Sequence, residues 1–144
     1  MRISTRGRYA LRAMADLALH STGDCIRTRD IAKRQNISEK YLEQIVTILS
    51  KSGLIRSTRG AQGGYRLARK PSEYTIGEIL RVAEGDLNPV PEDEAEENTV
   101  IAQCEKDLIY KRLYESINMV VDGITLDDIM KEYHERIEAL NYII

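Results

Sequence analysis

The strongest constraint on the fold lies in residues 38–69, SEKYLEQIVTILSKSGLIRSTRGAQGGYRLAR, where an amphipathic helical pattern runs directly into a glycine-tipped basic hairpin. Apolar residues recur here at the spacing of a buried helical stripe, and Gly53 ends the helix. Residues 54–58 and 65–68 then read as two short strands, separated by glycines that permit the positive backbone dihedrals of a tight turn. The predicted stripe comprises Leu42, Ile45, Val46 and Leu49.

Basic side chains surround this hairpin. A helix followed by a basic hairpin is how winged helix-turn-helix proteins hold duplex DNA, with the helix in the major groove and the hairpin in the minor groove. The order of the two elements therefore predicts a double-stranded DNA partner. The arginines, which the sequence places without a neighbouring acid, are Arg56, Arg59, Arg66 and Arg69.

Helical patterns before and after this unit complete the fold. Helices are expected over residues 5–20 and from about Thr28, with Thr28 as the cap of the second, and Ser38 is expected to cap the third. Residues 75–78 read as a capping box that opens a fourth helix, which ends at Gly85. Three helices with a short turn make a helix-turn-helix, so the predicted fold class is mainly α with a small β-hairpin wing.

The charge is divided between the two halves of the chain. Residues 1–70 carry 15 basic and 5 acidic residues, a net +10, whereas residues 71–144 carry 6 and 18, a net −12, which together give the −2 of the whole chain. A polyanion would be attracted to the first half and repelled by the second. Solvated surface alone would not predict so clean a boundary, so the division favours nucleic-acid binding.

At 144 residues the chain is long enough for one domain with an appended element. We expect a winged helix-turn-helix domain over residues 1–85, an acidic loop over 86–98, and a dimerisation helix with a C-terminal tail over 99–144. A short last helix is expected to start at Thr125. The long helix of residues 99–121 has an apolar face wider than one contact requires. It either packs only on its own domain or also pairs with a twin, and the width favours a symmetric homodimer.

Contacts to the phosphates would give affinity, and contacts to the base edges would give specificity. Gln44 can bond adenine, Glu43 can accept from cytosine, and a wing-tip arginine can enter a narrow minor groove. Ordinary helix surface is the alternative for the first two, packing for Tyr41, and solvated charge for the N-terminal arginines. The predicted DNA-binding residues are Arg2, Arg6, Arg8, Ser38, Lys40, Tyr41, Glu43, Gln44, Arg59 and Gly60.

Other classes of function find little support in the sequence. His20 and His134 are isolated, no nucleophile has a base nearby, and the acids form no metal motif, so we expect no enzyme, no metal and no cofactor. No apolar run approaches a membrane span, and the first residues are no signal sequence. Cys25 and Cys104 are too far apart for a disulfide framework, which indicates a cytoplasmic protein.

The segments RISTRGRYALRAM, SEKYLEQIVTILSKSGLIRSTRGAQGGYRLA and TIGEILRVAEG resemble the Rrf-two family of winged-helix regulators, which contains IscR, NsrR and CymR. The resemblance spans roughly the whole chain and is densest over residues 1–85. It implies a homodimeric bacterial transcription regulator, usually a repressor, that reads a palindromic operator with two helices and two wings. The match places Glu43 and Gln44 at base-reading positions and Arg59 at the wing tip.

Members of this family that bind an iron–sulfur cluster carry three cysteines in the loop before the long helix, often followed by a histidine. Only Cys104 matches here, because Glu92, Asn98 and Asp107 occupy the other positions. One thiolate cannot hold a cluster that needs four ligands. The chain is therefore closest to the cluster-free, CymR-like repressors of cysteine metabolism.

The C-terminus offers a second clue to that pathway. Its last residues are similar to the isoleucine-ended tails by which serine acetyltransferase plugs the active site of cysteine synthase, so Tyr142, Ile143 and Ile144 are predicted to bind cysteine synthase. The alternative is that they pack on the dimer helix. Cys25, close to two arginines and a helix start, is a candidate for redox control, with buried packing as the alternative.

Two other functions stay open. A regulator of the same fold could sense iron–sulfur or redox status, and iron in the purified protein would support the former. A winged-helix module could instead bind only proteins. A salt titration separates that module from a DNA reader, because a DNA reader releases counterions from the phosphates and loses affinity steeply with salt.

Overall fold

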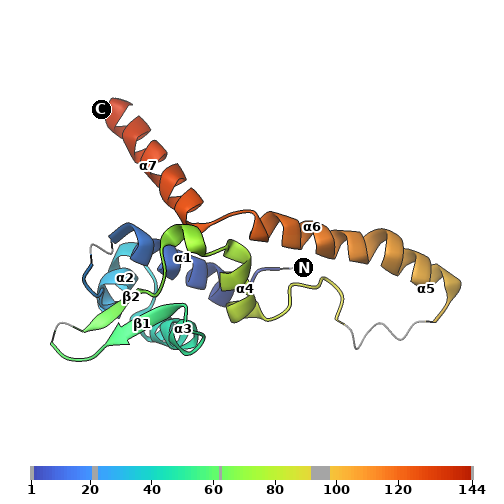
Figure 1. The fold of residues 1–144 in the computed structure, drawn as a ribbon, viewed down its shortest axis with the longest axis horizontal. Helices are drawn as coiled ribbons and strands as arrows, with labels where there is room; N and C mark the ends of the chain where they lie inside the picture. The colour runs from blue at the N-terminus through green and yellow to red at the C-terminus, as the bar shows by residue number, and fades with distance from the viewer. Residues whose placement is uncertain (1, 21–22, 62, 92–97, 144) are drawn as a thin grey trace.

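A computed structural model describes all residues except 1, 21–22, 62, 92–97 and 144. It is mostly helical with one two-stranded antiparallel hairpin, which confirms the predicted fold class (Figure 1). The helices of the first 85 residues surround one core, and a long helical arm extends away from it. The elements are α1 (Thr5–His20), α2 (Thr28–Gln35), α3 (Glu39–Lys51), β1 (Ile55–Thr58), β2 (Gly64–Leu67), the 3-10 turn η1 (Pro71–Glu73), α4 (Ile76–Glu84), α5 (Val100–Glu105), the π-helical turn η3 (Lys106–Tyr110), α6 (Lys111–Asp122) and α7 (Leu126–Ile143).

The core forms where α1, α3 and α4 pack together. All four residues of the stripe predicted on α3 are buried, because the 3, 4, 7 spacing puts them on the face that meets α1 and α4. The polar side of α3 is thereby turned outward. Further buried side chains come from the other helices, and they include Met14, Leu17, Ile31, Ile79, Leu80 and Leu126.

An acid inside the core fixes α2 against α1. The carboxylate of Asp16 is fully buried in α1 and accepts hydrogen bonds from Arg34 Nε and Nη2, at 3.0 and 2.7 Å, and from Gln35 Nε2, at 2.8 Å. The bond to Asp16 raises the pKa of Arg34. Paired in this way, the buried charge satisfies its hydrogen-bonding capacity and locks the first helix of the helix-turn-helix in place.

The capping predictions have mixed outcomes. Ser38 caps α3, because its Oγ accepts from the backbone N–H of Tyr41 at 3.4 Å. Thr28 as the cap of α2 is wrong: the capping position falls on Arg27, whose side chain makes no capping bond, and Thr28 is the first helical residue. The turn between α2 and α3 uses Asn36, which adopts the left-handed conformation at φ 54°.

The capping box expected over residues 75–78 is only half formed. Thr75 Oγ1 accepts from the backbone N–H of Glu78 at 3.1 Å, as the box requires. The carboxylate of Glu78 does not return the bond, because it pairs with Arg69 at 2.5 Å. Helix α4 therefore begins where the sequence indicates, but its first acid serves the hairpin next to it.

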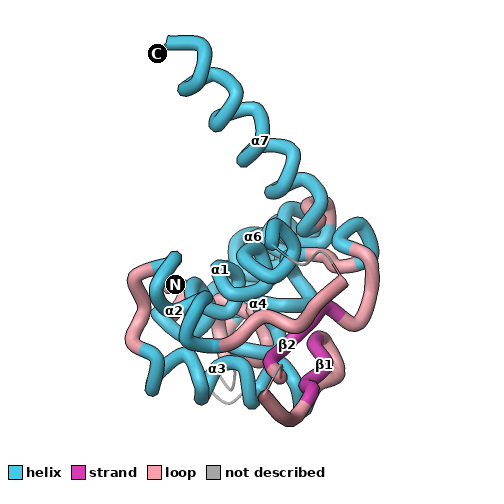
Figure 2. Tube along the Cα trace, turned by 90° about the vertical axis from the view of Figure 1, so that its left-hand side faces the viewer, coloured by secondary structure: helices cyan, strands magenta, loops and turns pink. Residues whose placement is uncertain are grey.

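Helices α5 and α6 and most of α7 extend beyond the core. α5, η3 and α6 run on from one another as a single arm that projects from the body, and α7 leaves the body in another direction (Figure 1; Figure 2). The prediction of a short last helix is wrong, since α7 has 18 residues and contains Tyr142 and Ile143 of the expected tail. Its stretch after Thr125 lacks glycine and proline, so nothing in the sequence stops the helix.

Candidate nucleic-acid interface

The polar face of α3 forms the centre of the candidate interface. The side chains of Lys40, Glu43 and Gln44 are exposed along the first half of the helix, opposite its buried stripe. Ser38 caps the same end, where free backbone N–H groups favour an anion such as a DNA phosphate. The arrangement is that of a recognition helix presented by its N-terminal half.

A shallow groove joins this face to the start of α1. It brings Arg6 and Gln44, which are far apart in the sequence, to the same hollow. The start of α1 is itself fixed, because Ser4 hydrogen-bonds through its backbone N–H, at 3.0 Å, and its hydroxyl to Glu84 at the end of α4. The groove is lined by Ser4, Thr5, Arg6, Tyr41, Gln44, Ile45 and Ile48.

The three N-terminal arginines are all exposed, and Arg8 donates to Thr5 Oγ1 at 3.1 Å. Arg6 lines the groove beside α3. Arg2 precedes the helix in a segment without regular structure. Arg6 thus places positive charge beside the recognition helix, where phosphates would run if the helix entered the major groove.

Tyr41 has a packing role. Its ring meets the ring of Tyr9 edge-on, with centroids 5.7 Å apart, and the guanidinium of Arg12 lies 5.2 Å from the centre of the Tyr9 ring. The side chain is half-buried between α1 and α3. The packing alternative is therefore observed, and a phosphate contact from the Tyr41 hydroxyl stays a prediction.

The wing lies beside α3, as both views of the chain agree (Figure 1; Figure 2). Arg56 and Arg66 are direct partners across the hairpin, so their exposed side chains share one face of it. Arg59 and Gly60 are exposed in the turn, and Gly60 has φ +109°, a conformation that other residues rarely adopt. The hairpin that packs beside the recognition helix thus carries three exposed arginines.

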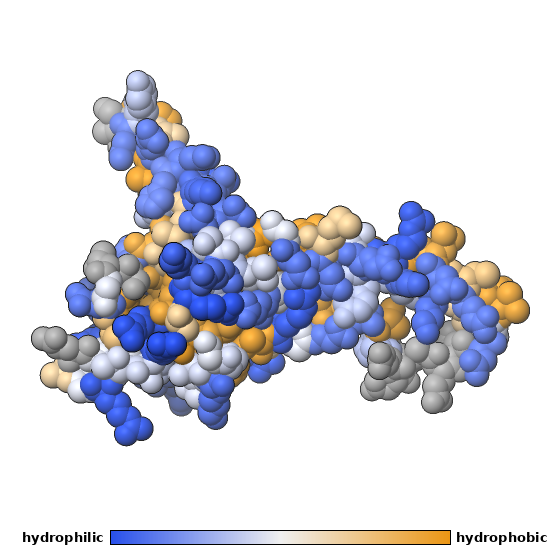
Figure 3. Space-filling view, in the orientation of Figure 1, coloured by the Kyte–Doolittle hydropathy of each residue, from blue (hydrophilic) through white to orange (hydrophobic). Residues whose placement is uncertain are grey.

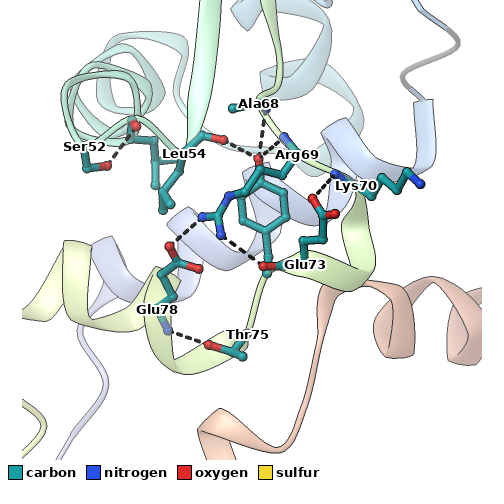
Figure 4. A network of polar contacts seen from close by, with 10 residues as sticks. Ser52, Leu54, Ala68, Arg69, Lys70, Glu73, Thr75 and Glu78 are labelled. Atoms are coloured by element: carbon teal, nitrogen blue, oxygen red, sulfur yellow. Dashed lines mark hydrogen bonds and ion pairs between the residues drawn. The ribbon is translucent and has the colours of Figure 1, made fainter.

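Arg69 does not belong to that set, which corrects the expectation that all four arginines lack a nearby acid. Figure 4 shows its guanidinium between the carboxylate of Glu78 and the backbone carbonyl of Glu73, bonds of 2.5 and 3.0 Å. It also lies 4.3 Å from the centre of the Tyr74 ring. The bond to Glu78 raises the pKa of Arg69. This arginine therefore stabilises the wing base, the residues that follow β2, and is not free to contact DNA.

The loop before α2 holds the wing, a role that the sequence did not indicate. Ile26 pairs with Tyr65 through two backbone hydrogen bonds of 2.8 Å, in an isolated antiparallel bridge beside β2. The side chain of Arg27 donates to the carbonyl of Ala61 in the turn, and the thiol of Cys25 lies 3.2 Å from Thr58 Oγ1. Only pairing partners more than thirty residues away define this role, so no local pattern could reveal it.

Cysteine positions do not fit an iron–sulfur cluster. The chain has two cysteines: Cys25 lies against the wing and Cys104 is exposed in α5, so they belong to separate elements. Among the described residues, no group of three or more His, Cys, Asp or Glu could hold a metal ion. Glu92 lies outside the described residues, and Asp107 is in η3. Redox control through Cys25 stays a prediction.

The predicted partner-binding tail is the last turn of α7. Tyr142 is 90% exposed and Ile143 is 84% exposed, so neither packs on the body of its own chain. Ile144 lies outside the described residues. In the part of the chain that the structure describes, no helix is long and apolar enough to cross a membrane.

The fold and its exposed recognition helix and basic wing define a transcription regulator with a winged-helix DNA-binding fold. The sequence profile of the Rrf2 family, described as iron-dependent transcriptional regulator, matches residues 3–132. The chain belongs to this family, which confirms the resemblance noted for its motifs.

Relatives and solved structures agree with this assignment. The chain is 40% identical over 129 residues to CymR of Bacillus subtilis, covering 90% of this chain and 89% of CymR, and 35% identical over 130 residues to IscR of Aliivibrio salmonicida, covering 90% and 77%. The solved structure of B. subtilis CymR, a global cysteine regulator, superposes with a TM-score of 0.79 at 38% identity, covering 92% of this chain and 98% of CymR. T. potens IscR gives 0.75 at 39% identity, covering 94% and 90%. CymR and IscR are named as transcriptional regulators and not as enzymes.

Proposed function

We propose that the chain is a homodimeric bacterial repressor that binds a palindromic operator of cysteine or sulfur metabolism genes. The observation that supports DNA binding best is the exposed polar face of α3, which shares a groove with Arg6 and belongs to a helix that lies beside the wing with its exposed arginines. In this arrangement Gln44 reads a base in the major groove and Arg59 enters the minor groove. Such a regulator acts on chromosomal DNA, and so in the cytoplasm.

Exposed apolar side chains on the arm support the homodimer. Val100 is 76% exposed at the start of α5, and apolar surface gathers at the far end of the arm (Figure 3). A single chain leaves this surface in water, and burying it against a second copy would stabilise a dimer with two-fold symmetry. The exposed apolar residues of the arm include Val100, Ile101, Leu108, Ile109, Leu113, Met119 and Val120.

Alanine at Gln44 and at Arg59 is expected to have different effects on DNA binding. Gln44→Ala should relax specificity at one base pair by about 1–3 kcal/mol, because one bidentate base contact is lost. Arg59→Ala should weaken A·T-flanked sites most, because their narrow minor groove attracts an inserted arginine. Fluorescence anisotropy with operator variants measures both effects. Equal losses on all sequences for Gln44→Ala would assign that residue to the DNA backbone.

A salt titration of the unaltered protein separates this proposal from a module that binds only proteins. Several arginine–phosphate contacts release counterions, so the affinity for duplex DNA should fall steeply as salt rises. A nearly flat response would favour the protein-binding module. Mapping of bound sites across a genome would then name the regulated pathway.

The cysteine pathway rests on the likeness to CymR and on the tail. B. subtilis CymR is a global cysteine regulator, and this chain is similar to it over nine-tenths of its length. The exposed Tyr142 and Ile143 are available to an apolar pocket that also captures a terminal carboxylate. Because these residues are helical here, the last turn would have to unwind to enter a substrate pocket as an extended tail.

Deleting Ile143 and Ile144 should abolish measurable binding to cysteine synthase while leaving DNA affinity intact. The reason is that the deletion removes the apolar end but touches neither the core nor the α3 face. Isothermal titration against purified cysteine synthase measures the first effect and anisotropy the second. Unchanged affinity for the synthase would refute a role of the tail.

A further inference from the structure

The arm is clamped to the DNA-binding body at one end. Arg81 on α4 bonds both oxygens of Asp122 at the end of α6, with Nη1 to Oδ1 at 2.7 Å and Nη2 to Oδ2 at 2.9 Å, and its Nη2 also donates to Asn118 Oδ1 at 2.8 Å. A bidentate arginine–carboxylate pair fixes orientation as well as distance. The pairing raises the pKa of Arg81 and lowers that of Asp122.

Backbone bonds close the joint immediately after α6. The N–H of Ile76 donates to the carbonyl of Ile124 at 2.8 Å, and the N–H of Leu126 donates to the carbonyl of Tyr74 at 3.1 Å. The side chain of Leu126 is fully buried in the core. The connection between α6 and α7 is thus hydrogen-bonded to the body and packed against it, and it is not a free linker.

Gly77 lets α4 and α6 approach this closely. A Cβ atom at this position would lie 2.1 Å from Asp122 Oδ1, 2.8 Å from Arg81 Nη1 and 3.0 Å from Val121 Cγ2. Separations of this size are far inside van der Waals contact, so any other residue would displace the clamp. Glycine is used here for its missing side chain and not for an unusual backbone conformation.

The clamp acts at one end of a long lever. Further along α6, the hydroxyl of Tyr114 bonds Asp86 Oδ1 at 2.5 Å, and beyond that point the arm projects from the body (Figure 1). From Val100 to Asp122 a helix rises about 33 Å, at 1.5 Å per residue. A tilt of roughly 10° at the clamp would move the far end by about 6 Å, which is close to the length of two base pairs at 3.4 Å each.

We infer that the Gly77–Arg81–Asp122 joint determines the spacing between the two operator half-sites that the dimer accepts. The inference rests on the proposed homodimeric DNA reader, in which the two arms pair and each carries one recognition helix. Because each arm is clamped to its own body, the separation of the two helices is fixed by the joint angle. A palindrome is read only when its half-sites match that separation.

The test uses the full chain and duplexes with two inverted copies of a half-site selected by this protein from random DNA. The copies are placed at the selected spacing and at one or two base pairs more or less. The wild type should lose affinity by about tenfold or more when the spacing changes by one base pair, a loss similar to that which a mismatched base pair typically causes in protein–DNA complexes. Arg81→Gln and Gly77→Ala should shift the preferred spacing or reduce that discrimination to about threefold, with their best affinity retained.

The matched control is Arg136→Gln, which breaks an exposed ion pair with Glu132 on α7, far from the joint, and should leave the spacing preference unchanged. Arg81→Lys keeps the positive charge but cannot form the bidentate pair with Asp122. Its spacing discrimination should fall between those of the wild type and Arg81→Gln. If Gly77→Ala fails to fold, Arg81→Gln still tests the inference. Arg81 is partly exposed, so its replacement should not prevent folding.

The outcomes separate the inference from the proposed function. A dimeric variant with a shifted or broadened spacing preference supports the inference. An unchanged preference, or an equal loss at every spacing, overturns the inference and leaves the proposed function standing. A wild type that is monomeric or that ignores duplex DNA overturns the proposed function, and the inference with it. Size-exclusion chromatography with light scattering supplies the oligomeric state.

Discussion

Replacing Asp16 by alanine is expected to lower the free energy of unfolding by about 3 kcal/mol, because two charge-assisted hydrogen bonds from Arg34 and one from Gln35 are lost together. The carboxylate is fully buried, so water does not replace these bonds in the folded state. Arg34 is about one-third exposed and can turn to solvent, which keeps the cost below that of stranding a fully buried charge. Urea denaturation followed by circular dichroism measures the change.

Two further variants show whether the buried network is the cause. Asp16→Asn keeps the shape but sets amide hydrogens against the donors of Arg34 and Gln35, and it should lose less than alanine. Glu132→Ala removes the acid of an exposed helical ion pair with Arg136, and it should change stability little. Stability within about 0.5 kcal/mol of wild type for Asp16→Ala would contradict the assignment.

Loss of the hydrogen bonds to Asp16 should also weaken DNA binding. Arg34 and Gln35 end α2, and the left-handed turn at Asn36 leads directly into the cap of α3. Without the bond to Asp16, α2 is free to shift against α1, and the recognition helix shifts with it. In the absence of urea, where both variants are folded, Asp16→Ala should therefore bind the operator more weakly than Glu132→Ala.

Local patterns in the sequence were sufficient for most of the helices. The stripe of α3, its serine cap and the start of α4 each depend on residues within about one turn of one another, where the 3.6-residue period and capping chemistry are decisive. The hairpin was equally accessible, because its glycines mark the turn. Helix α7 is longer than expected, although its sequence holds no helix breaker, because an apolar segment at the end of a chain is compatible with a separate binding tail as well as with a helix.

Long-range partners were the part that the sequence could not supply. Arg69 looked free because Glu78 lies beyond a strand end and a 3-10 turn, and only the folded chain brings the two together. The link from Arg27 to the wing turn and the clamp of Arg81 on Asp122 cross 34 and 41 residues. A charge count predicted the basic half correctly, but it could not say which arginines are fastened and which face outward.

Tyr74→Phe, which removes the hydroxyl at the base of the wing, should have the second large effect on stability. In Tyr74→Phe, Leu54 loses the donor of a 2.6 Å hydrogen bond, and the backbone N–H groups of Ala68 and Arg69 lose their acceptor, each at 2.9 Å. Buried backbone groups without partners are costly, so the free energy of unfolding should fall by about 2 to 3 kcal/mol. Ala68 keeps a long bond of 3.4 Å to Leu54, which prevents a larger loss.

The same variant should weaken the wing more than it weakens the fold, because this hydroxyl ties the residue before β1 to the residues after β2. The phenylalanine ring would still lie beneath the guanidinium of Arg69, so the stacking and the ion pair to Glu78 remain. The matched control is Tyr65→Phe in β2, whose hydroxyl bonds no residue that the structure describes. We expect Tyr74→Phe, and not Tyr65→Phe, to reduce affinity for A·T-flanked operators selectively, as Arg59→Ala does. Equal affinities of the two variants across all flanking sequences would mean that the hydroxyl stabilises the body without positioning the wing.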